Sequence, residues 1–167
     1  MAVTYEPIGS ITLSSPATSM TVSSIPNTYT DLRIVWSLKY DTTSNATRIR
    51  FNGDTGSNYS YTYLYTNGST LGTSTSGNET SILVDHNSGF GTSQFVTYEM
   101  DIFSYASSAN KMLMDKMSSD ANGAGAVSRS ARCWRNSAAI NSIVLYRNDG
   151  NNYSTGSSMT VWGILKA

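Results

Sequence analysis

Hydrophobic and polar residues alternate along several stretches of this chain, most clearly over residues 31–40. Apolar side chains recur at every second position from Leu32 through Trp36 to Tyr40, and polar residues fill most positions between them. A period of two places successive side chains on opposite faces of a β-strand. The pattern predicts a strand with one face in the core.

The last stretch holds two apolar runs, 140–147 and 159–165, separated by a cluster of turn-forming residues that includes Gly150 and Gly156. Glycine permits the positive φ angles that turns require, so these runs are expected to form an antiparallel pair joined by a long loop. Both faces of the second run are partly apolar. That favours a strand inside a sandwich over a strand at an exposed edge.

The remaining runs give further strands. Pro7 confines the first run to a sheet edge, because proline has no N–H for the ladder. An Asn-Gly pair at Asn52 predicts a hairpin between 47–51 and 59–65. The runs at 94–106 and 110–117 are expected to be antiparallel partners. Strands are expected at 3–13, 20–25, 47–51, 59–65, 80–85, 94–106 and 110–117.

Two segments rich in small residues lack such a pattern. Segments 67–78 and 118–127 are expected to be loops, and 129–135 leads into the final pair. No stretch has the period of an amphipathic helix. The sequence therefore predicts an all-β fold, an antiparallel, jelly-roll-like β-sandwich of about nine to eleven strands without significant helix.

Length and composition limit the classes of function that this chain can have. The 167 residues suit a single domain over 1–167. Charged residues are only 13% and the formal net charge is zero, so no basic excess indicates a nucleic-acid partner. Serine and threonine, 48 residues together, supply much of the polar surface, which suits dense packing beside copies of the same chain. No membrane span or secretory signal is expected.

The sequence offers little evidence for a catalytic site or a metal site. His86, beside Asp85, is the single histidine, and Glu99 and Asp101 share one strand face. Both pairs of residues are interpreted as solvated surface residues. The sequence therefore predicts neither an enzyme nor a cofactor. Two loops carry oxygen ligands that calcium could use, but turn formation explains them better. Their residues are Asn52, Asp54, Ser57 and Asn58 in one loop, and Asn148, Asp149 and Asn151 in the other.

Two groups of side chains are candidates for an interface. The first is the tyrosine row of the 59–65 strand, since aromatic rings stacked along one strand can pack within the sheet, bind sugars or fill a protein interface. The second is a set of arginines around Trp134 and Cys133, which could meet acidic groups of a neighbouring subunit. The candidates are Tyr59, Tyr61, Tyr63, Tyr65, Arg129, Arg132, Arg135 and Trp134.

Four segments resemble small structural proteins of tailed bacteriophages. They are IPNTYTDLRIVWS at 25–37, RFNGDTGSNYSY at 50–61, DIFSYAS at 101–107 and GSSMTVWGIL at 156–165. The resemblance implies a β-sandwich virion component, either a capsid decoration (cement) protein or a part of a tail or fibre. It brings no catalytic residues.

The expected function is therefore decoration of the capsid surface, with the major capsid protein and copies of the chain itself, in a homotrimer, as partners. The alternative is a tail-associated module that binds host carbohydrate through the tyrosines and the Asn/Asp loops.

Overall fold

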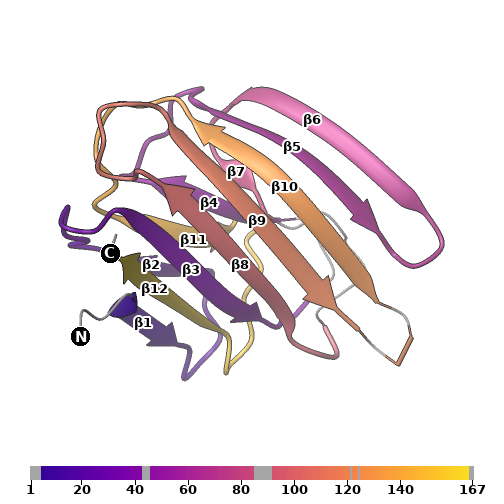
Figure 1. Ribbon diagram of the computed structural model, residues 1–167. Helices are drawn as coiled ribbons and strands as arrows, with labels where there is room; N and C mark the ends of the chain where they lie inside the picture. The colour runs from indigo at the N-terminus through magenta and orange to yellow at the C-terminus, as the bar shows by residue number, and fades with distance from the viewer. Residues whose placement is uncertain (1–4, 43–45, 85–91, 121, 124, 166–167) are drawn as a thin grey trace.

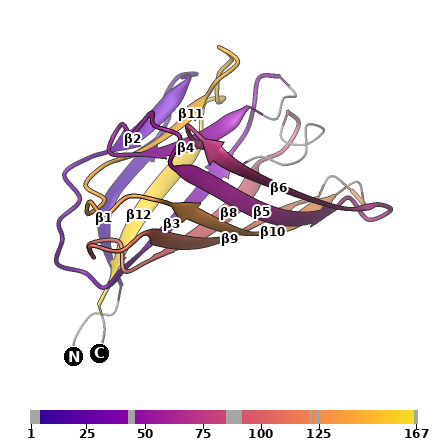
Figure 2. The same ribbon diagram turned by 90° about the horizontal axis from the view of Figure 1, so that it is seen from above.

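Two antiparallel sheets stack face to face in this protein. The computed structural model describes residues 5–42, 46–84, 92–120, 122–123 and 125–165, and those residues contain twelve strands and no helix. Eight strands form one sheet and four form the other (Figures 1 and 2). The chain is an all-β, jelly-roll-like sandwich, so the predicted fold class is confirmed.

The strands are short and follow one another along the whole described chain. They are β1 (Tyr5–Thr12), β2 (Ser19–Val22), β3 (Asp31–Leu38), β4 (Thr47–Phe51), β5 (Tyr59–Thr66), β6 (Leu71–Glu79), β7 (Ile82–Leu83), β8 (Val96–Phe103), β9 (Lys111–Ser119), β10 (Ala126–Trp134), β11 (Ile143–Arg147) and β12 (Ser158–Ile164).

The large sheet runs in the order β1-β12-β3-β8-β9-β10-β5-β6, and the small sheet in the order β2-β11-β4-β7. β1 is an edge strand whose register shifts between Pro7 and Gly9, as the proline predicts. β12 lies between β1 and β3, which confirms that the last run is internal. β8 and β9 pair as expected.

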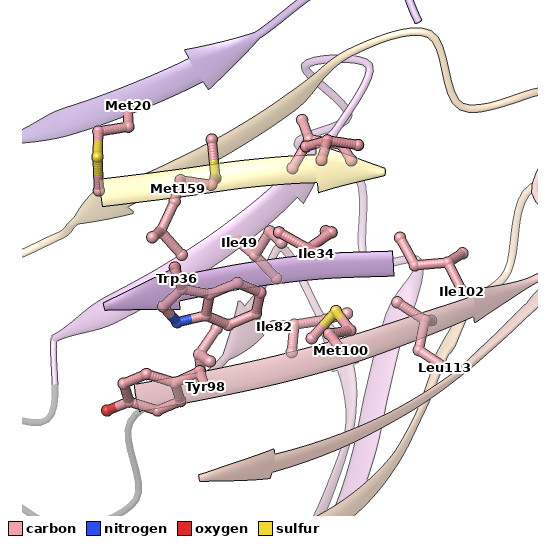
Figure 3. Close-up of a cluster of buried hydrophobic side chains, with 14 of the residues drawn as sticks. Met20, Ile34, Trp36, Ile49, Ile82, Tyr98, Met100, Ile102, Leu113 and Met159 are labelled. Carbon is pink, nitrogen blue, oxygen red and sulfur yellow. The ribbon is translucent and has the colours of Figure 1, made fainter. Parts of the chain in front are cut away.

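The core fills the space between the sheets (Figure 3). The alternation in β3 puts Leu32, Ile34 and Trp36 on this inner face, where all three are fully buried. The Trp36 ring stacks on Tyr98 of β8 at a centroid distance of 5.6 Å. Each such side chain contributes roughly 1.5–3 kcal/mol by leaving water, so the period-two pattern supplies much of the folding free energy.

Two predicted pairings are wrong, because in both cases the chain crosses between the sheets. β4 lies in the small sheet and β5 in the large one, so the Asn-Gly loop does not close a hairpin. β11 and β12 are divided in the same way. Turn residues show that the chain reverses, but they do not show which sheet receives the next strand. The β4–β5 crossing is held by the Tyr59 hydroxyl, which accepts a hydrogen bond from the Phe51 N–H at 3.2 Å.

One predicted loop is a strand, and another is shorter than predicted. The segment 67–78 forms most of β6, whereas in 118–127 a turn at residues 122–123 connects the end of β9 to the start of β10. Most of the segment 129–135 belongs to β10. Serine, threonine and glycine carry a weak strand signal, since they bury little apolar surface. Here the ladders to β5 and β9 supply the order that the side chains do not.

Candidate functional site on the outer face of the large sheet

The large sheet has an outer face that points away from the small sheet. Alternate residues of β5, β8, β9 and β10 reach this face, and five of them are large, apolar and 40–56% exposed. We call these five residues the outer patch: Leu64, Phe103, Met112, Met114 and Val127. Contiguous apolar exposure on one face of a soluble protein typically marks a site of interaction.

Strand register brings the outer patch together. Met112 of β9 lies directly opposite Phe103 of β8, and Met114 follows two residues later on the same face. Met114 and Leu64 line one shallow hollow, while Leu64 and Val127 line a second of about 520 Å³. The patch therefore crosses four neighbouring strands.

Charged residues border the patch on one side. The Arg33 guanidinium donates to the Asp101 carboxylate at 2.6 and 2.9 Å and lies 3.4 Å from Glu99. Lys116 pairs with the other Glu99 oxygen at 2.9 Å. These contacts give Glu99 and Asp101 a structural role in an ion-pair network, in agreement with the interpretation as surface residues.

Arg129 lies on the outer face between Lys116 and Leu64, opposite both in the ladders. It is exposed, and it makes no ion pair within the described part of the chain. A cation beside half-exposed methionine and leucine side chains gives this face a mixed character, suited to contact with a protein surface.

The predicted arginine group does not exist as one patch, because β10 alternates. Arg129 points outward, whereas Arg132 is on the inner face with 1% of its surface exposed. The Arg132 guanidinium pairs with both Asp115 oxygens, donates to the Leu83 carbonyl and to the Ser130 hydroxyl, and lies over the Tyr61 ring. Arg135 donates to the Ser57 carbonyl and the Asn78 side chain instead.

The tyrosine row lies on the inner face of β5. Tyr59 is fully buried and Tyr61 is 8% exposed, so these two do not present a free surface. Tyr63 and Tyr65 are partly exposed and continue the row, with ring centroids 6.0 Å apart at each step. Trp134 is fully buried and stacks on Tyr59 at 6.3 Å. Packing within the sandwich, which sequence reasoning left open for the tyrosine row, accounts for Tyr59, Tyr61 and Trp134.

The two candidate calcium loops use their oxygens internally. The Asp54 carboxylate accepts from the Gly56 N–H at 2.8 Å, the Asn58 amide at 2.9 Å and the Trp134 indole N–H at 2.8 Å. Burial raises the pKa of Asp54, but the hydrogen bonds to its charged form together lower the pKa by more than burial raises it. The pKa of Asp54 is therefore below the usual 3.8. Asp149 accepts from Arg147 at 3.1 and 2.6 Å.

Two further kinds of feature, metal sites and membrane-spanning helices, are absent from the described residues. Among those residues, no group of three or more His, Cys, Asp or Glu side chains is placed to hold a metal ion. In the same part of the chain, no helix is long and apolar enough to cross a membrane. His86 and Asp85 lie outside the described residues.

Sequence reasoning missed the outer patch, although a signal was present. In β9, Met112, Leu113 and Met114 are consecutive apolar residues, so both faces of that strand carry apolar side chains. The alternation of β9 alone does not say which face the small sheet covers.

No known family model matches this chain, and no curated protein matches it. Among solved structures, the galectin LEC-6 of Caenorhabditis elegans is similar to it at 12% identity and a TM-score of 0.44, over 91% of this chain and 94% of that chain. A Shewanella oneidensis MR-1 protein of unknown function, SO2946, has 10% identity and a TM-score of 0.34, over 98% and 77%. Scytalido-glutamic peptidase has 9% identity and a TM-score of 0.24, over 93% and 66%. Likeness at this level carries no argument about function.

Proposed function

We propose that this chain is a structural protein of a tailed-bacteriophage virion that decorates the capsid and stabilises it. The single observation that carries the proposal is the outer patch, five half-exposed hydrophobic side chains on one sheet face. The phage setting comes from the four sequence segments that resemble such proteins. The partner is the major capsid protein, and the chain acts by binding rather than by catalysis.

The outer patch is of a size that gives weak binding for each copy of the protein. Covering a half-exposed Met or Leu side chain contributes about 1 kcal/mol, so the five together contribute about 5 kcal/mol. Losses of rotational and translational freedom offset a similar amount. One copy therefore binds weakly, and stable decoration needs several sites used at once on a symmetric shell.

The test is the copy number of the protein in purified particles, measured by quantitative mass spectrometry. We expect a number on the order of that of the major capsid protein. A few to a few tens of copies would move the protein to the tail, and its absence from the particle would overturn the virion proposal.

Two variants connect this test to the outer patch. Leu64→Glu with Met114→Glu places charge on the patch and is expected to remove the protein from particles. Thr21→Glu is the matched control, because Thr21 is an exposed residue of β2 in the other sheet. Retention of the patch variant at the level of the control would contradict docking through this face.

A tail-associated, carbohydrate-binding module is the second candidate. The tyrosine row no longer supports it as an open aromatic platform, since Tyr59 and Tyr61 are buried. A different aromatic residue favours it: Trp162 is half-buried on the outer face, paired with Arg33, which in turn holds Asp101. An aromatic ring beside polar side chains is a common arrangement for stacking on a sugar. Binding on a glycan array that is lost in Trp162→Ala would support this candidate.

A further inference from the structure

The two edges of the large sheet differ in a way that concerns assembly. At one edge, β1 carries Pro7, which has no N–H to offer and blocks pairing with another strand. At the other edge, β6 has nine residues, no proline and no lysine, and Glu79 at its end is its only charge. An open edge strand of this length is a template for strand addition.

The ladders show which backbone groups of β6 are open. The Arg135 N–H donates to the Asn58 carbonyl at 2.8 Å, and the Asn67 N–H donates to the Thr70 carbonyl at 3.3 Å. Antiparallel ladders alternate, so even-numbered residues of β5 bond β10 and odd-numbered ones bond β6. On β6 the even-numbered residues therefore bond β5. The open N–H and C=O groups belong to Leu71, Thr73 and Thr75, and beyond Ser76 the ladder shifts register at Gly77 and Asn78.

We infer that β6 pairs antiparallel with β6 of a second copy about a two-fold axis, so that the two large sheets become one continuous sheet. A pairing centred on Ser74 sets Thr73 opposite Thr75 of the partner and Leu71 opposite Gly77 of the partner. This register uses the open groups of Thr73 and Thr75 in both copies and places Leu71 beside the bulged end of the partner strand. The inference goes beyond the proposed function and does not depend on a capsid.

The side chains fit this register. Leu71 is the most exposed of the large hydrophobic residues in the described chain, at 71%. The space above Gly77 is open, since a side-chain carbon there would meet nothing within 4 Å. The Leu71 side chain of each copy can therefore cover Gly77 of the other. Facing threonines can exchange hydroxyl hydrogen bonds, as Thr62 and Thr75 already do at 3.2 Å within one copy.

Charge also permits the pairing. Residues 71–78 carry none, so two identical strands do not repel each other. A two-fold axis perpendicular to the sheet leaves both outer faces on the same side. The dimer then presents two outer patches together, which strengthens binding to a surface with repeated sites.

The first test is the mass in solution by light scattering after size-exclusion chromatography. We expect twice the chain mass of 18.0 kDa for the wild type and the single chain mass for Thr73→Lys/Thr75→Lys, in which lysines face lysines across the axis. Thr21→Lys/Thr97→Lys is the matched control, with two exposed threonines away from the β6 edge, and it is expected to stay dimeric. Circular dichroism checks that each variant is folded. A monomeric wild type at about 100 μM, a concentration far above the dissociation constant of a typical specific complex, would overturn the inference. A trimer would also overturn it, as would a dimer that persists in the edge variant.

The second test fixes the register by disulfide cross-linking in a Cys133→Ala background. In this register Ser74 lies opposite Ser74 of the second copy, in a non-hydrogen-bonded pair. The Cα atoms of such a pair are about 4.5 Å apart, which is within the range of a disulfide. Ser74→Cys is expected to form a covalent dimer under mild oxidation. Ser76→Cys lies far from its counterpart in this register and is expected to remain monomeric on a non-reducing gel. Equal cross-linking at both positions would refute the pairing.

Discussion

The buried pair of Arg132 and Asp115 offers the sharpest test of how this sandwich is built. Neither side chain has any exposed surface. Two separate substitutions, Arg132→Met and Asp115→Leu, each remove one charge and leave the other uncompensated between the sheets. Breaking a buried pair in this way typically costs about 3–5 kcal/mol. For a chain of this size that corresponds to a fall in Tm on the order of 10 °C.

The double variant separates the charge effect from lost packing. With both charges replaced by apolar side chains of similar size, no buried charge remains unpaired. The Leu83 carbonyl and the Ser130 hydroxyl still lose their donor, which costs about 1–2 kcal/mol in total. The double variant is therefore expected to be at least about 2 kcal/mol more stable than either single variant.

Denaturant unfolding followed by tryptophan fluorescence measures these differences, because Trp36 and Trp134 are both fully buried. Arg129→Met, on the outer face of the same strand, is the matched control and is expected to change stability by less than about 0.5 kcal/mol. If Arg132→Met cost less than about 1 kcal/mol, as surface pairs do, the assignment of Arg132 to the inner face would be wrong.

Three further predictions concern single positions. In Gly163→Ala the new methyl group would overlap the Tyr29 ring, so the free energy of unfolding is expected to fall by about 1–3 kcal/mol in thermal or denaturant unfolding; an unchanged value would mean that Tyr29 does not cover this glycine. The folded-state pKa of Asp54 is below its unfolded value, so its contribution to stability is present above the unfolded pKa and is lost as pH falls through the folded pKa. Wild type should therefore lose stability below about pH 4 more steeply than Asp54→Asn, and parallel pH profiles would contradict this. Burial raises the pKa of Cys133 more than nearby Arg135 lowers it, so alkylation by iodoacetamide at pH 7.5 is expected to be slow in the folded protein and fast in urea; equal rates would contradict the burial.

The sequence by itself determined where most strands lie and which side chains of them face inward. In β3 Leu32, Ile34, Trp36 and Leu38 are all in the core, as the period of two requires, and Val35 lies on the other face. Pro7 correctly predicted an edge, because a missing N–H is a property of the residue itself. These features depend only on local backbone geometry, which the residue type controls directly.

Only the tertiary structure decided how the strands combine. The assignment of β4 and β5 to different sheets depends on pairing with β11 and β10, which lie far away in sequence. The residue types of β6 carry a weak strand signal, and its pairing with β5 makes it a strand. The same holds for the candidate site. Arg129 and Arg132 look alike in sequence, yet one is exposed and the other is buried against Asp115. The outer patch is exposed because the four-stranded sheet covers the opposite face of the large sheet, and no local pattern in the chain specifies which face another sheet will cover.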